Sequence, residues 1–376
     1  MLRVLFDDEI FSTQLEGGVS RYFTHLVEEL PAAGVTPLLP FRLTCNRHLG
    51  QSRAFAGWQP PRFPGSRRMI RAINRRDSLA ALDRGQFEIW HASWYDGTAL
   101  AHVRTQPAKR VVATVYDMTP EVMPEAIVAG FDNPHAGKLA MVEAADLVVA
   151  ISAATKADLL RFSPVPADRV RVVHLGVGER LLWRPALGRP EGLPDRFLLF
   201  VGKRGGYKNF DGVAPALAAL LAATSDLHLV CVGGGSLAVA ESAPFQAVGA
   251  QDRVRQIQAD DGTLAWCYAH AAAFLFPSRY EGFGLPILEA FINRCPAVLA
   301  ERSCFPEIGG EAALYFDPDR PEALVDQLGR LLATPEERRR LGDAGALRAR
   351  DFSWRRTAAA HADLYRELAL SGPVAG

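Results

Sequence analysis

One segment of the sequence places two carboxylates beside a predicted anion site. Residues 278–290, SRYEGFGLPILEA, follow the apolar run AAFLFP. Pro286 is typical of the first turn of a helix, and a helix that begins here presents its N–H groups and the positive end of its dipole to an anion. Carboxylates accept hydrogen bonds, so Glu281 and Glu289 predict contacts with sugar or ribose hydroxyls. The plainer alternative is a structural helix start whose acids serve only the dipole.

A second segment, VGKRGGYKNF at 201–210, follows the apolar run FLLF. Lys203, Arg204 and Lys208 put three cations within six residues of a glycine-containing loop. Cations of this kind, set opposite an anion-binding helix, favour a clamp on a diphosphate. The alternative is a solvated basic turn.

Weaker signals follow other predicted strands. The pair Gly17–Gly18 in EGGVSRY precedes a helix as a phosphate-approaching turn would, but it does not match GxGxxG and fits a plain tight turn as well. His91, Tyr116 and Asp117 are polar residues at strand ends, in IWHASWYD and VYDMTP. We expect them to face the ligand side, although a lone strand-end histidine is often structural.

These loops need strands to position them, because ligands bind beyond the carboxyl ends of parallel strands. Apolar runs alternate with helical stretches along the whole chain, which predicts parallel sheets covered by helices. The expected strands are 3–6, 35–40, 88–92, 111–115, 147–151, 170–174, 197–201, 227–232, 254–258, 273–276, 297–300 and 313–316. Expected helices include 19–33, 138–145 and 354–370.

A length of 376 residues is too great for one ordinary core and predicts two domains. The stretch RPALGRPEGLPD, 184–195, holds three prolines and two glycines and has no apolar period, so it is typical of a linker. We therefore expect an α/β protein of two doubly wound, Rossmann-like domains, 1–184 and 185–353. A last helix in 354–376 is expected to pack back on the N-terminal domain.

The composition excludes several classes of protein. Lys plus Arg and Asp plus Glu are both 42, so there is no basic excess of the kind that nucleic-acid binders carry. Hydrophobic residues make up 49%, which argues against disorder. No apolar run reaches the roughly 18–20 residues that span a bilayer, and the acidic start does not fit a signal peptide. The five cysteines form no CxxC pair and are expected to be buried thiols in a reducing cytoplasm.

One local basic stretch stands out against the zero net charge. Residues 62–76, RFPGSRRMIRAINRR, contain six arginines and no acid, with Met69, Ile70 and Ile73 interleaved. Such a stretch fits an anionic membrane surface or acceptor, and it also fits a solvated helix face. The DxD string Asp317–Asp319 in FDPDRP contains a proline and is interpreted as a turn.

The sequence resembles the retaining glycosyltransferases of family 4, which have two facing Rossmann-like domains in the GT-B architecture. The resemblance rests on seven stretches, which occur in the expected order over nearly the whole chain. They are GGVSRY, KADLL after AIS, VVHLGVG, VGKRGGYKNF, PSRYEGFGLPILEAF, PEIGGEAALYFDP and DFSW. The spacing of Glu281 and Glu289 within EGFGLPILEA is specific. YKNF and PEIGGEAALYFDP look most like bacterial mannosyltransferases of O-antigen and exopolysaccharide synthesis.

The resemblance implies a role for each matched position. Arg204 and Lys208 would bind the diphosphate of a nucleotide-sugar donor, and Glu281 would contact the sugar. Glu289 would hold the ribose, and Gln256–Gln258 would meet the base. The implied catalytic residues are Glu281, Arg204, Lys208, Tyr116 and Asp117. The implied donor-binding residues are Gly17, Gly18, Lys203, Gln256, Ile257, Gln258, Gly282, Phe283, Gly284, Leu285 and Glu289, with His91 on the acceptor side.

One position departs from the family pattern. Tyr116 stands in VYD where the family usually has a histidine that contacts the donor sugar. A phenol can donate and accept a hydrogen bond but carries no charge at neutral pH. The substitution leaves three interpretations open: replacement of the contact, a different way of working, or reduced activity.

The resemblance implies hexose transfer from a nucleoside-diphosphate sugar, with GDP-mannose favoured, to a glycan or polyprenyl-diphosphate-linked acceptor. Basic residues and a helix start would stabilise the leaving diphosphate, so no metal or other cofactor is expected. The enzyme would lie in the cytoplasm, with peripheral contact to the inner membrane through 62–76. The alternatives are a nucleotide-sugar epimerase or phosphorylase of the same fold, and a non-catalytic nucleotide-sugar-binding homologue.

Overall fold

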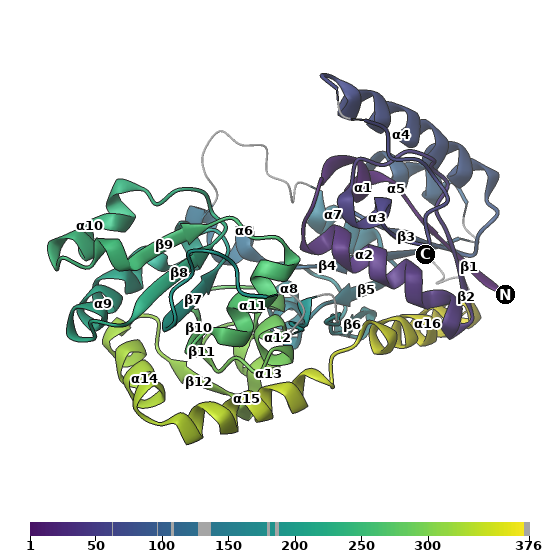
Figure 1. Ribbon diagram of the computed structural model, residues 1–376. Helices are drawn as coiled ribbons and strands as arrows, with labels where there is room; N and C mark the ends of the chain where they lie inside the picture. The colour runs from purple at the N-terminus through teal and green to yellow at the C-terminus, as the bar shows by residue number, and fades with distance from the viewer. Residues whose placement is uncertain are drawn as a thin grey trace. The chain divides into compact units, whose positions relative to one another are not determined.

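The chain forms two compact units. The computed structural model describes residues 1–61, 63–95, 97–106, 109–126, 137–178, 181–184 and 188–371. Unit 1 comprises Met1–Gly176 and Trp354–Gly376, and unit 2 comprises Val177–Ser353 (Figure 1). The division falls after Gly176 rather than after Arg184, and 185–187 of the predicted linker lie outside the described residues.

Unit 1 is built on a parallel sheet with the strand order β2-β1-β3-β4-β5-β6. Its central strands β3, β4 and β5 are buried along their whole length, as expected of strands covered by helices on both faces. The strands are β1 Leu2–Phe6, β2 Val35–Leu38, β3 Ile89–Ala92, β4 Arg110–Val115, β5 Leu147–Ala150 and β6 Val170–Val172.

The helices of unit 1 connect these strands and supply its loops. They are α1 Glu9–Thr13, α2 Gly18–Glu29, α3 Arg47–Gly50, α4 Ser66–Arg84, α5 Gly97–Arg104, α6 Thr119–Val122, α7 Lys138–Ala144, α8 Ala153–Phe162 and α16 Trp354–Leu370. Helix α16 contacts α2, although more than 300 residues separate the two in the sequence. Its Tyr365 is fully buried, so this helix is part of the unit 1 core.

Unit 2 is built on a second parallel sheet, with the order β12-β11-β10-β7-β8-β9. Strands β8, β10 and β11 are almost entirely buried apolar runs. The strands are β7 Phe197–Val201, β8 His228–Val232, β9 Val254–Ile257, β10 Ala273–Phe276, β11 Ala297–Ala300 and β12 Ala313–Phe316.

The helices of unit 2 lie on the two faces of this sheet (Figure 1). One group of contacting helices contains α9, α10 and α14, and the other contains α11, α12, α13 and α15. Their bounds are α9 Phe210–Ala223, α10 Val239–Ala247, α11 Asp261–His270, α12 Leu285–Ile292, α13 Phe305–Gly309, α14 Pro321–Ala333 and α15 Pro335–Ala349.

The predicted fold class is confirmed: the chain is α/β, with two doubly wound parallel sheets. Each expected strand has its counterpart, although the expected 35–40 and 170–174 end two residues earlier in β2 and β6. The expected helix 19–33 is α2 followed by the 3-10 helix Leu30–Ala33, where Pro31 cannot continue the α-helical hydrogen bonding. All five cysteines are buried free thiols.

Candidate active site

The strand order of unit 2 reverses between β7 and β10. From this point β8 and β9 extend in one direction, and β11 and β12 extend in the other. In parallel sheets, ligands bind at such a reversal, beyond the carboxyl ends of the strands. Both predicted chemistry-bearing loops, 202–209 and 277–284, follow these two strands.

Lys208 and Glu281 meet at this reversal. Lys208 ends the 3-10 helix Gly206–Lys208 after β7, and its Nζ donates to Oε1 of Glu281, which follows β10. The Lys208 Nζ also lies 5.1 Å from the Tyr207 ring centroid and 5.5 Å from that of Phe276. The two charged side chains are 17% and 15% exposed, so a ligand can reach them. The structure thus offers one cation for an anion and one carboxylate for hydroxyl groups.

Backbone and amide hydrogen bonds join the two loops. The Arg279 N–H donates to the Tyr207 carbonyl at 2.8 Å. The Asn209 side chain donates to the Pro277 carbonyl at 3.2 Å and accepts from Arg279 Nε at 3.3 Å. Asn209 has φ of 58°, a left-handed conformation that asparagine tolerates better than most residues. These contacts hold the Lys208–Glu281 pair in place.

The glycine loop before α12 is fixed at both ends. The Glu281 carbonyl accepts from Ser303 Oγ at 2.5 Å and from Cys304 Sγ at 3.2 Å. Gly284 caps α12 with φ of 86°, and a Cβ there would lie 3.0 Å from Ile287 Cδ1. A residue with a side chain would be strained in this conformation and crowded in this space. The backbone path into α12 therefore requires a glycine at position 284.

Glu289 lies inside α12 and is only 6% exposed. Its Oε2 accepts from the Tyr268 hydroxyl of α11 at 3.1 Å. The neighbouring Asn293 donates to the Glu289 carbonyl and to the Leu181 carbonyl, and it accepts from the Trp183 N–H. A buried carboxylate held by a phenol is a fixed acceptor, suited to a hydroxyl that approaches from one direction.

The structure gives Arg204 a position unlike the one predicted from sequence. It is 3% exposed, and its Nε donates to Glu241 Oε1 at 3.1 Å. Its terminal nitrogens donate to the carbonyls of Gly233, Gly235 and Ser236 at 2.8–3.0 Å. The guanidinium is thus surrounded by acceptors of its own unit, whereas the neighbouring Lys203 is exposed.

Sequence reasoning missed the loop that Arg204 holds. Gly233, Gly234 and Gly235 follow β8 and have φ of 86°, 74° and 74°. A Cβ on Gly234 would lie 2.8 Å from Arg204 Nη1 and 2.9 Å from the Gly202 carbonyl. Three consecutive glycines directly after an apolar run are a signal that such a loop reaches the same sheet edge.

The predicted base-contacting segment lies at the end of β9. Gln256 Nε2 donates to the Ile257 carbonyl at 2.9 Å and to the Gly233 carbonyl at 3.3 Å. Its side chain is therefore used by the backbone, and Ile257 is half-buried. Gln258 is exposed just beyond the strand.

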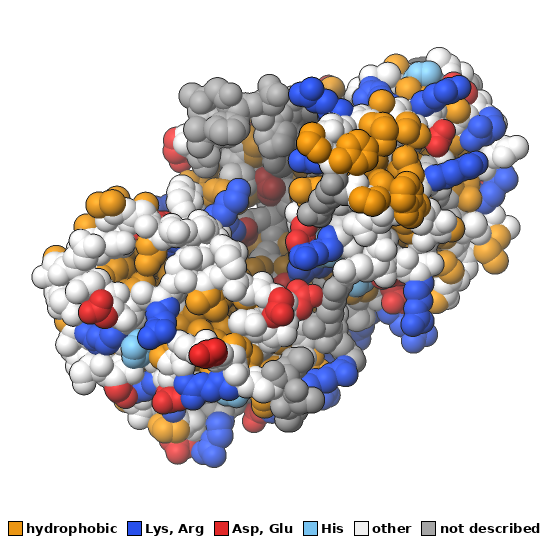
Figure 2. All heavy atoms as spheres, turned by 45° about the horizontal axis from the view of Figure 1, so that its top comes forward, with side chains coloured by type: hydrophobic (Ala, Val, Ile, Leu, Met, Phe, Trp, Pro, Cys, Tyr) orange, Lys and Arg blue, Asp and Glu red, His pale blue; other side chains and the backbone are white. Residues whose placement is uncertain are grey.

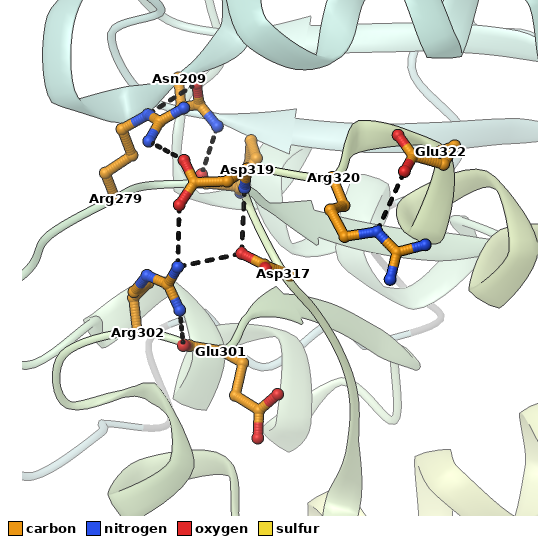
Figure 3. Close-up of polar contacts among 9 residues, drawn as sticks. Asn209, Arg279, Glu301, Arg302, Asp317, Asp319, Arg320 and Glu322 are labelled. Atoms are coloured by element: carbon orange, nitrogen blue, oxygen red, sulfur yellow. Dashed lines mark hydrogen bonds and ion pairs between the residues drawn. The ribbon is translucent and has the colours of Figure 1, made fainter.

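The DxD string after β12 belongs to an ion-pair network (Figure 3). Asp319 accepts from Arg279 Nη1 at 2.5 Å and from Arg302 Nη2 at 2.9 Å, and Arg302 also donates to Asp317 at 3.0 Å. The Asp319 N–H donates to Asp317 Oδ1 at 3.1 Å, which closes a turn. Hydrogen bonds from the two arginines lower the pKa of Asp319. Within the described ranges, no three His, Cys, Asp or Glu residues gather as a metal site would require.

The sheet of unit 1 reverses between β1 and β3, and a buried carboxylate lies there. Asp7 follows β1 and accepts from Trp90 Nε1 at 3.0 Å, from the Ser93 N–H at 3.2 Å and from the Ser93 hydroxyl. It also accepts from the Glu9 N–H at 3.1 Å. Burial raises the pKa of Asp7 to about 6, and the hydrogen bonds from Ser93 and Glu9 oppose the rise.

Tyr116 and Asp117 follow β4 in unit 1. The Tyr116 hydroxyl donates to the Ser93 carbonyl at 3.3 Å, and its ring stacks on Trp94 with centroids 5.6 Å apart. Burial raises the pKa of Tyr116 well above 10, so the phenol stays neutral. Asp117 is half-buried and accepts from the Thr119 N–H at 2.9 Å, in the turn that leads into α6.

The structure corrects the assignment of His91 to the acceptor side. His91 is fully buried, and its ring nitrogens bond to the Tyr365 hydroxyl at 2.6 Å and to Thr114 Oγ1 at 2.7 Å. Burial and the neighbouring His361 hold the pKa of His91 well below 6.5. It is a neutral core residue, because its position in the middle of the sheet leaves it no path to solvent.

The Gly17–Gly18 turn leads directly into α2. The Gln14 side chain folds over Gly17, where a Cβ would lie 2.5 Å from its Cδ, and its Oε1 accepts from the Ser20 N–H at 3.0 Å. Apart from Gly18 itself, its two chain neighbours and the backbone of its own helix, no heavy atom of the described residues lies within 4 Å of a Cβ built on Gly18. The turn is therefore capped on one side and open on the other.

Two family models match this chain, one over each half. The model described as Glycosyltransferase Family 4 matches residues 16–179. The model described as Glycosyl transferases group 1 matches residues 183–348. Together they cover most of both units.

Curated relatives agree with this result. The O-antigen chain mannosyltransferase B of Escherichia coli is 27% identical over 260 residues, 65% of this chain and 67% of that protein. The D-inositol 3-phosphate glycosyltransferase of Streptomyces bingchenggensis is 31% identical over 311 residues, 75% of this chain and 67% of that protein.

Solved structures share the fold. Sucrose-phosphate synthase from Thermosynechococcus elongatus matches with a TM-score of 0.71 and 22% identity, over 98% of this chain and 99% of that one. HepE of Anabaena, solved with UDP and glucose, matches with a TM-score of 0.71 and 15% identity over 98% and 100%. This chain belongs to the family 4 glycosyltransferases and is a transferase enzyme of the GT-B fold.

Proposed function

We propose that this enzyme transfers a hexose, with mannose favoured, from a nucleoside-diphosphate sugar to a glycan acceptor. The acceptor is a bacterial surface polysaccharide precursor, carried on a polyprenyl diphosphate. The preference for mannose is supported by the O-antigen chain mannosyltransferase among the relatives. The other relative described above acts, by its name, on an inositol phosphate, so donor and acceptor need direct tests.

The observation that carries the proposal is the Lys208–Glu281 pair at the strand reversal of unit 2. In the proposed complex each partner exchanges the other for a donor group. Lys208 contacts the diphosphate, and the Glu281 carboxylate accepts from a sugar hydroxyl. The pair is part-buried, so both contacts form where water screens charge less than at the surface.

The chemical step breaks the bond between sugar C1 and the diphosphate oxygen, and the electron pair leaves with the diphosphate. The oxygen of the acceptor hydroxyl bonds to C1 on the same face, which retains the configuration, and its proton passes to the leaving diphosphate oxygen. Negative charge grows on the diphosphate as it leaves, and in this proposal Lys208, Lys203 and the N-terminus of α12 stabilise it. Arg204 supports this site indirectly, because its hydrogen bonds hold the Gly233–Gly235 loop in place.

Recognition of the nucleoside rests on two further positions. Glu289, fixed by Tyr268, accepts from the ribose hydroxyls. The backbone beyond β9, at 257–258, meets the base.

Membrane contact is a further part of the proposal. Of the predicted basic stretch 62–76, Arg62 lies outside the described residues, and the rest forms the N-terminal half of α4 with the segment before it. In the described part of the chain, no helix is long and apolar enough to cross a bilayer. Arg67, Arg68, Arg71 and Arg76 are exposed on α4, which suits an anionic membrane surface.

A donor panel tests the transferase proposal. Purified enzyme is incubated with GDP-mannose, UDP-glucose and related donors, and release of the nucleoside diphosphate is followed with and without acceptor. We expect one donor to be turned over and Lys208→Ala and Glu281→Ala to lose most of that turnover. Full activity in both variants would contradict the site assignment.

The same incubation separates the alternatives. An epimerised sugar nucleotide formed without acceptor would contradict the transferase proposal. Donor binding without any turnover would favour the non-catalytic homologue. For the membrane, co-sedimentation with phosphatidylglycerol vesicles is expected to fall when Arg67, Arg68, Arg71 and Arg75 are neutralised.

A further inference from the structure

In unit 2, a carboxylate that the proposed reaction does not use joins the loops that follow three neighbouring strands. The strands are β12, β11 and β10, which lie side by side in the sheet. Asp317 and Asp319 follow β12, Arg302 follows β11 and Arg279 follows β10, and Figure 3 shows their side chains pointing toward one another. Because the strands are parallel, these loops leave the sheet at the same edge as the proposed donor site. Figure 2 shows charged side chains of both signs on the surface of the molecule.

Asp319 divides its two carboxylate oxygens between two loops. Its Oδ1 accepts from Arg279 Nη1 at 2.5 Å, and its Oδ2 accepts from Arg302 Nη2 at 2.9 Å. Asp317, in the same turn, accepts from the same Arg302 nitrogen at 3.0 Å. The carboxylate of Asp319 therefore ties the loop after β10 to the loop after β11.

The arginine of the loop after β10 lies two positions before Glu281. Arg279 donates through its backbone N–H to the Tyr207 carbonyl at 2.8 Å and through Nε to Asn209 Oδ1 at 3.3 Å. Its guanidinium thus bridges the loop after β7 and the turn after β12. The carboxylate that holds the far end of this guanidinium restrains the chain on the N-terminal side of Glu281.

The arginine of the loop after β11 precedes a residue that holds Glu281 directly. Ser303 follows Arg302, and its Oγ donates to the Glu281 carbonyl at 2.5 Å. Ser303 has φ of 52°, a left-handed conformation that costs free energy for a residue with a side chain. Such a conformation persists only where surrounding contacts fix it. The ion pairs of Arg302 on one side and the Ser303 hydroxyl bond on the other are contacts of this kind.

These ion pairs contribute little to the global stability of unit 2. The side chains are 40% exposed for Arg279, 43% for Arg302 and 55% for Asp319. A single pair of this exposure adds little to the free energy of unfolding. The rate of a reaction, in contrast, responds strongly to a small displacement of a group that contacts the substrate. The effect of Asp319 is therefore expected in the placement of Glu281.

We propose that Asp319 is a positioning residue: through Arg279 and Arg302 it holds the loop 278–284, and so places Glu281 where it meets the donor sugar. The effect on sugar transfer rests on the proposed function, whereas the effect on the loop does not. Asp319 acts through the two arginines and does not contact the donor.

Hydrogen–deuterium exchange of the full chain, measured by mass spectrometry of its peptides, tests the effect on the loop. Asp319→Ala is expected to speed exchange in 278–284 by about five- to tenfold, since it removes two part-exposed charged hydrogen bonds. Asp226→Ala is the matched control, because it also removes an exposed carboxylate from an arginine, Arg196, but just before β8, near the opposite sheet edge. It is expected to leave exchange in 278–284 unchanged.

Steady-state kinetics with the sugar nucleotide that the wild type turns over tests the effect on transfer. Asp319→Ala is expected to lower kcat by about five- to tenfold and to change the KM for the donor by less than about twofold, because Lys208 and Glu289 still bind the donor. In the Glu281→Ala background, the same substitution is expected to change kcat by less than about twofold, because no carboxylate remains to be positioned. A merely structural role would give the same loss in both backgrounds.

Four results would overturn the inference. They are unchanged exchange in 278–284 of Asp319→Ala, an equal loss of kcat with and without Glu281, a loss of equal size in Asp226→Ala, and a raised KM for the donor with unchanged kcat. The last result would place Asp319 against the donor itself. If the wild type turns over no sugar nucleotide, the proposed function fails, and the exchange measurement alone decides whether Asp319 holds the loop.

Discussion

Each unit contains a parallel sheet with one reversal of strand order, but the two sheets differ in strand order and in what lies at the reversal. In unit 1 the reversal between β1 and β3 holds Asp7, which is 3% exposed and is surrounded by neutral donors from Trp90 and Ser93. In unit 2 the reversal between β10 and β7 holds Lys208 and Glu281, a charged pair that is 17% and 15% exposed.

This difference indicates that the reversal in unit 1 serves the stability of the fold, whereas the reversal in unit 2 serves ligand binding. The carboxylate of unit 1 has its acceptor positions filled by its own chain, so it joins β1 to β3 and offers little to a ligand. In unit 2, Lys208 and Glu281 form an ion pair with each other. A diphosphate can replace Glu281 as the partner of Lys208, and a sugar hydroxyl can replace Lys208 as the partner of Glu281. The strand reversal of a parallel sheet can therefore be closed for support or left accessible for binding.

The largest test of this comparison is Lys208→Ala. If Lys208 stabilises the leaving diphosphate, turnover should fall by about 10²- to 10³-fold, or about 3–4 kcal/mol of transition-state stabilisation. Thermal unfolding should change little, since the side chain is part-exposed. The measurement is nucleoside diphosphate release under saturating donor. Arg196→Ala, just before the start of β7 and so near the opposite sheet edge, is the control and should keep full turnover.

Next in size is Arg204→Ala, which tests whether unit 2 also contains a purely supporting cation. The variant leaves Glu241 and the carbonyls of the Gly233–Gly235 loop without their donor, so we expect a loss of about 3 kcal/mol in the free energy of unfolding. Urea denaturation measures it. Lys203→Ala, the exposed neighbour, should keep its stability and weaken donor binding only. An Arg204→Ala enzyme of normal stability would contradict the supporting role.

For unit 1 the comparison predicts sensitivity to acid. Burial lowers the pKa of His361 from 6.5 to about 4, so the folded state keeps this histidine neutral while the unfolded state takes up a proton. Its contribution of about 3 kcal/mol is present above pH 6.5 and is lost as pH falls toward 4. His361→Gln should flatten this part of the stability–pH curve.

The shifted pKa of Asp7 should change the free energy of unfolding with pH in the opposite direction. Its pKa is raised from 3.8 to about 6, so the folded state binds the proton more tightly than the unfolded state. The associated stabilisation is present below pH 3.8 and is lost as pH rises through 6. The wild type minus Asp7→Asn difference in unfolding free energy should thus fall by about 3 kcal/mol between pH 3 and 7. A difference that is constant with pH would contradict the raised pKa.

The strands were predictable because covered parallel strands are short apolar runs, and FLLF and AFLF can hardly be anything else. The loop 278–285 was equally clear, since EGFGLP has the glycine and proline that its path into α12 demands. The pairing of Lys208 with Glu281 was not derivable from spacing. It depends on β7 and β10 being neighbours, which is a property of the whole sheet.

The roles of His91 and Arg204 could not be foreseen for the same physical reason. The partner of His91 is Tyr365, which α16 supplies 274 positions later. The acceptors of Arg204 are mainly backbone carbonyls of the loop after β8, and carbonyls leave no mark in a sequence. A histidine or an arginine that follows a strand looks the same in sequence whether it hydrogen-bonds to other residues of the protein or to a substrate.

Helix α16 has a consequence for the order in which the protein is made. Unit 2 is one continuous stretch, 177–353, so its core is built from a single run of the sequence. Unit 1 is not, because Tyr365 bonds His91 and His361 bonds Tyr22 at 2.8 Å deep in its interior. Its first 176 residues therefore cannot complete this core until α16 has been added, after the whole of unit 2 has been translated. During synthesis, the unit that begins first must wait for its last helix.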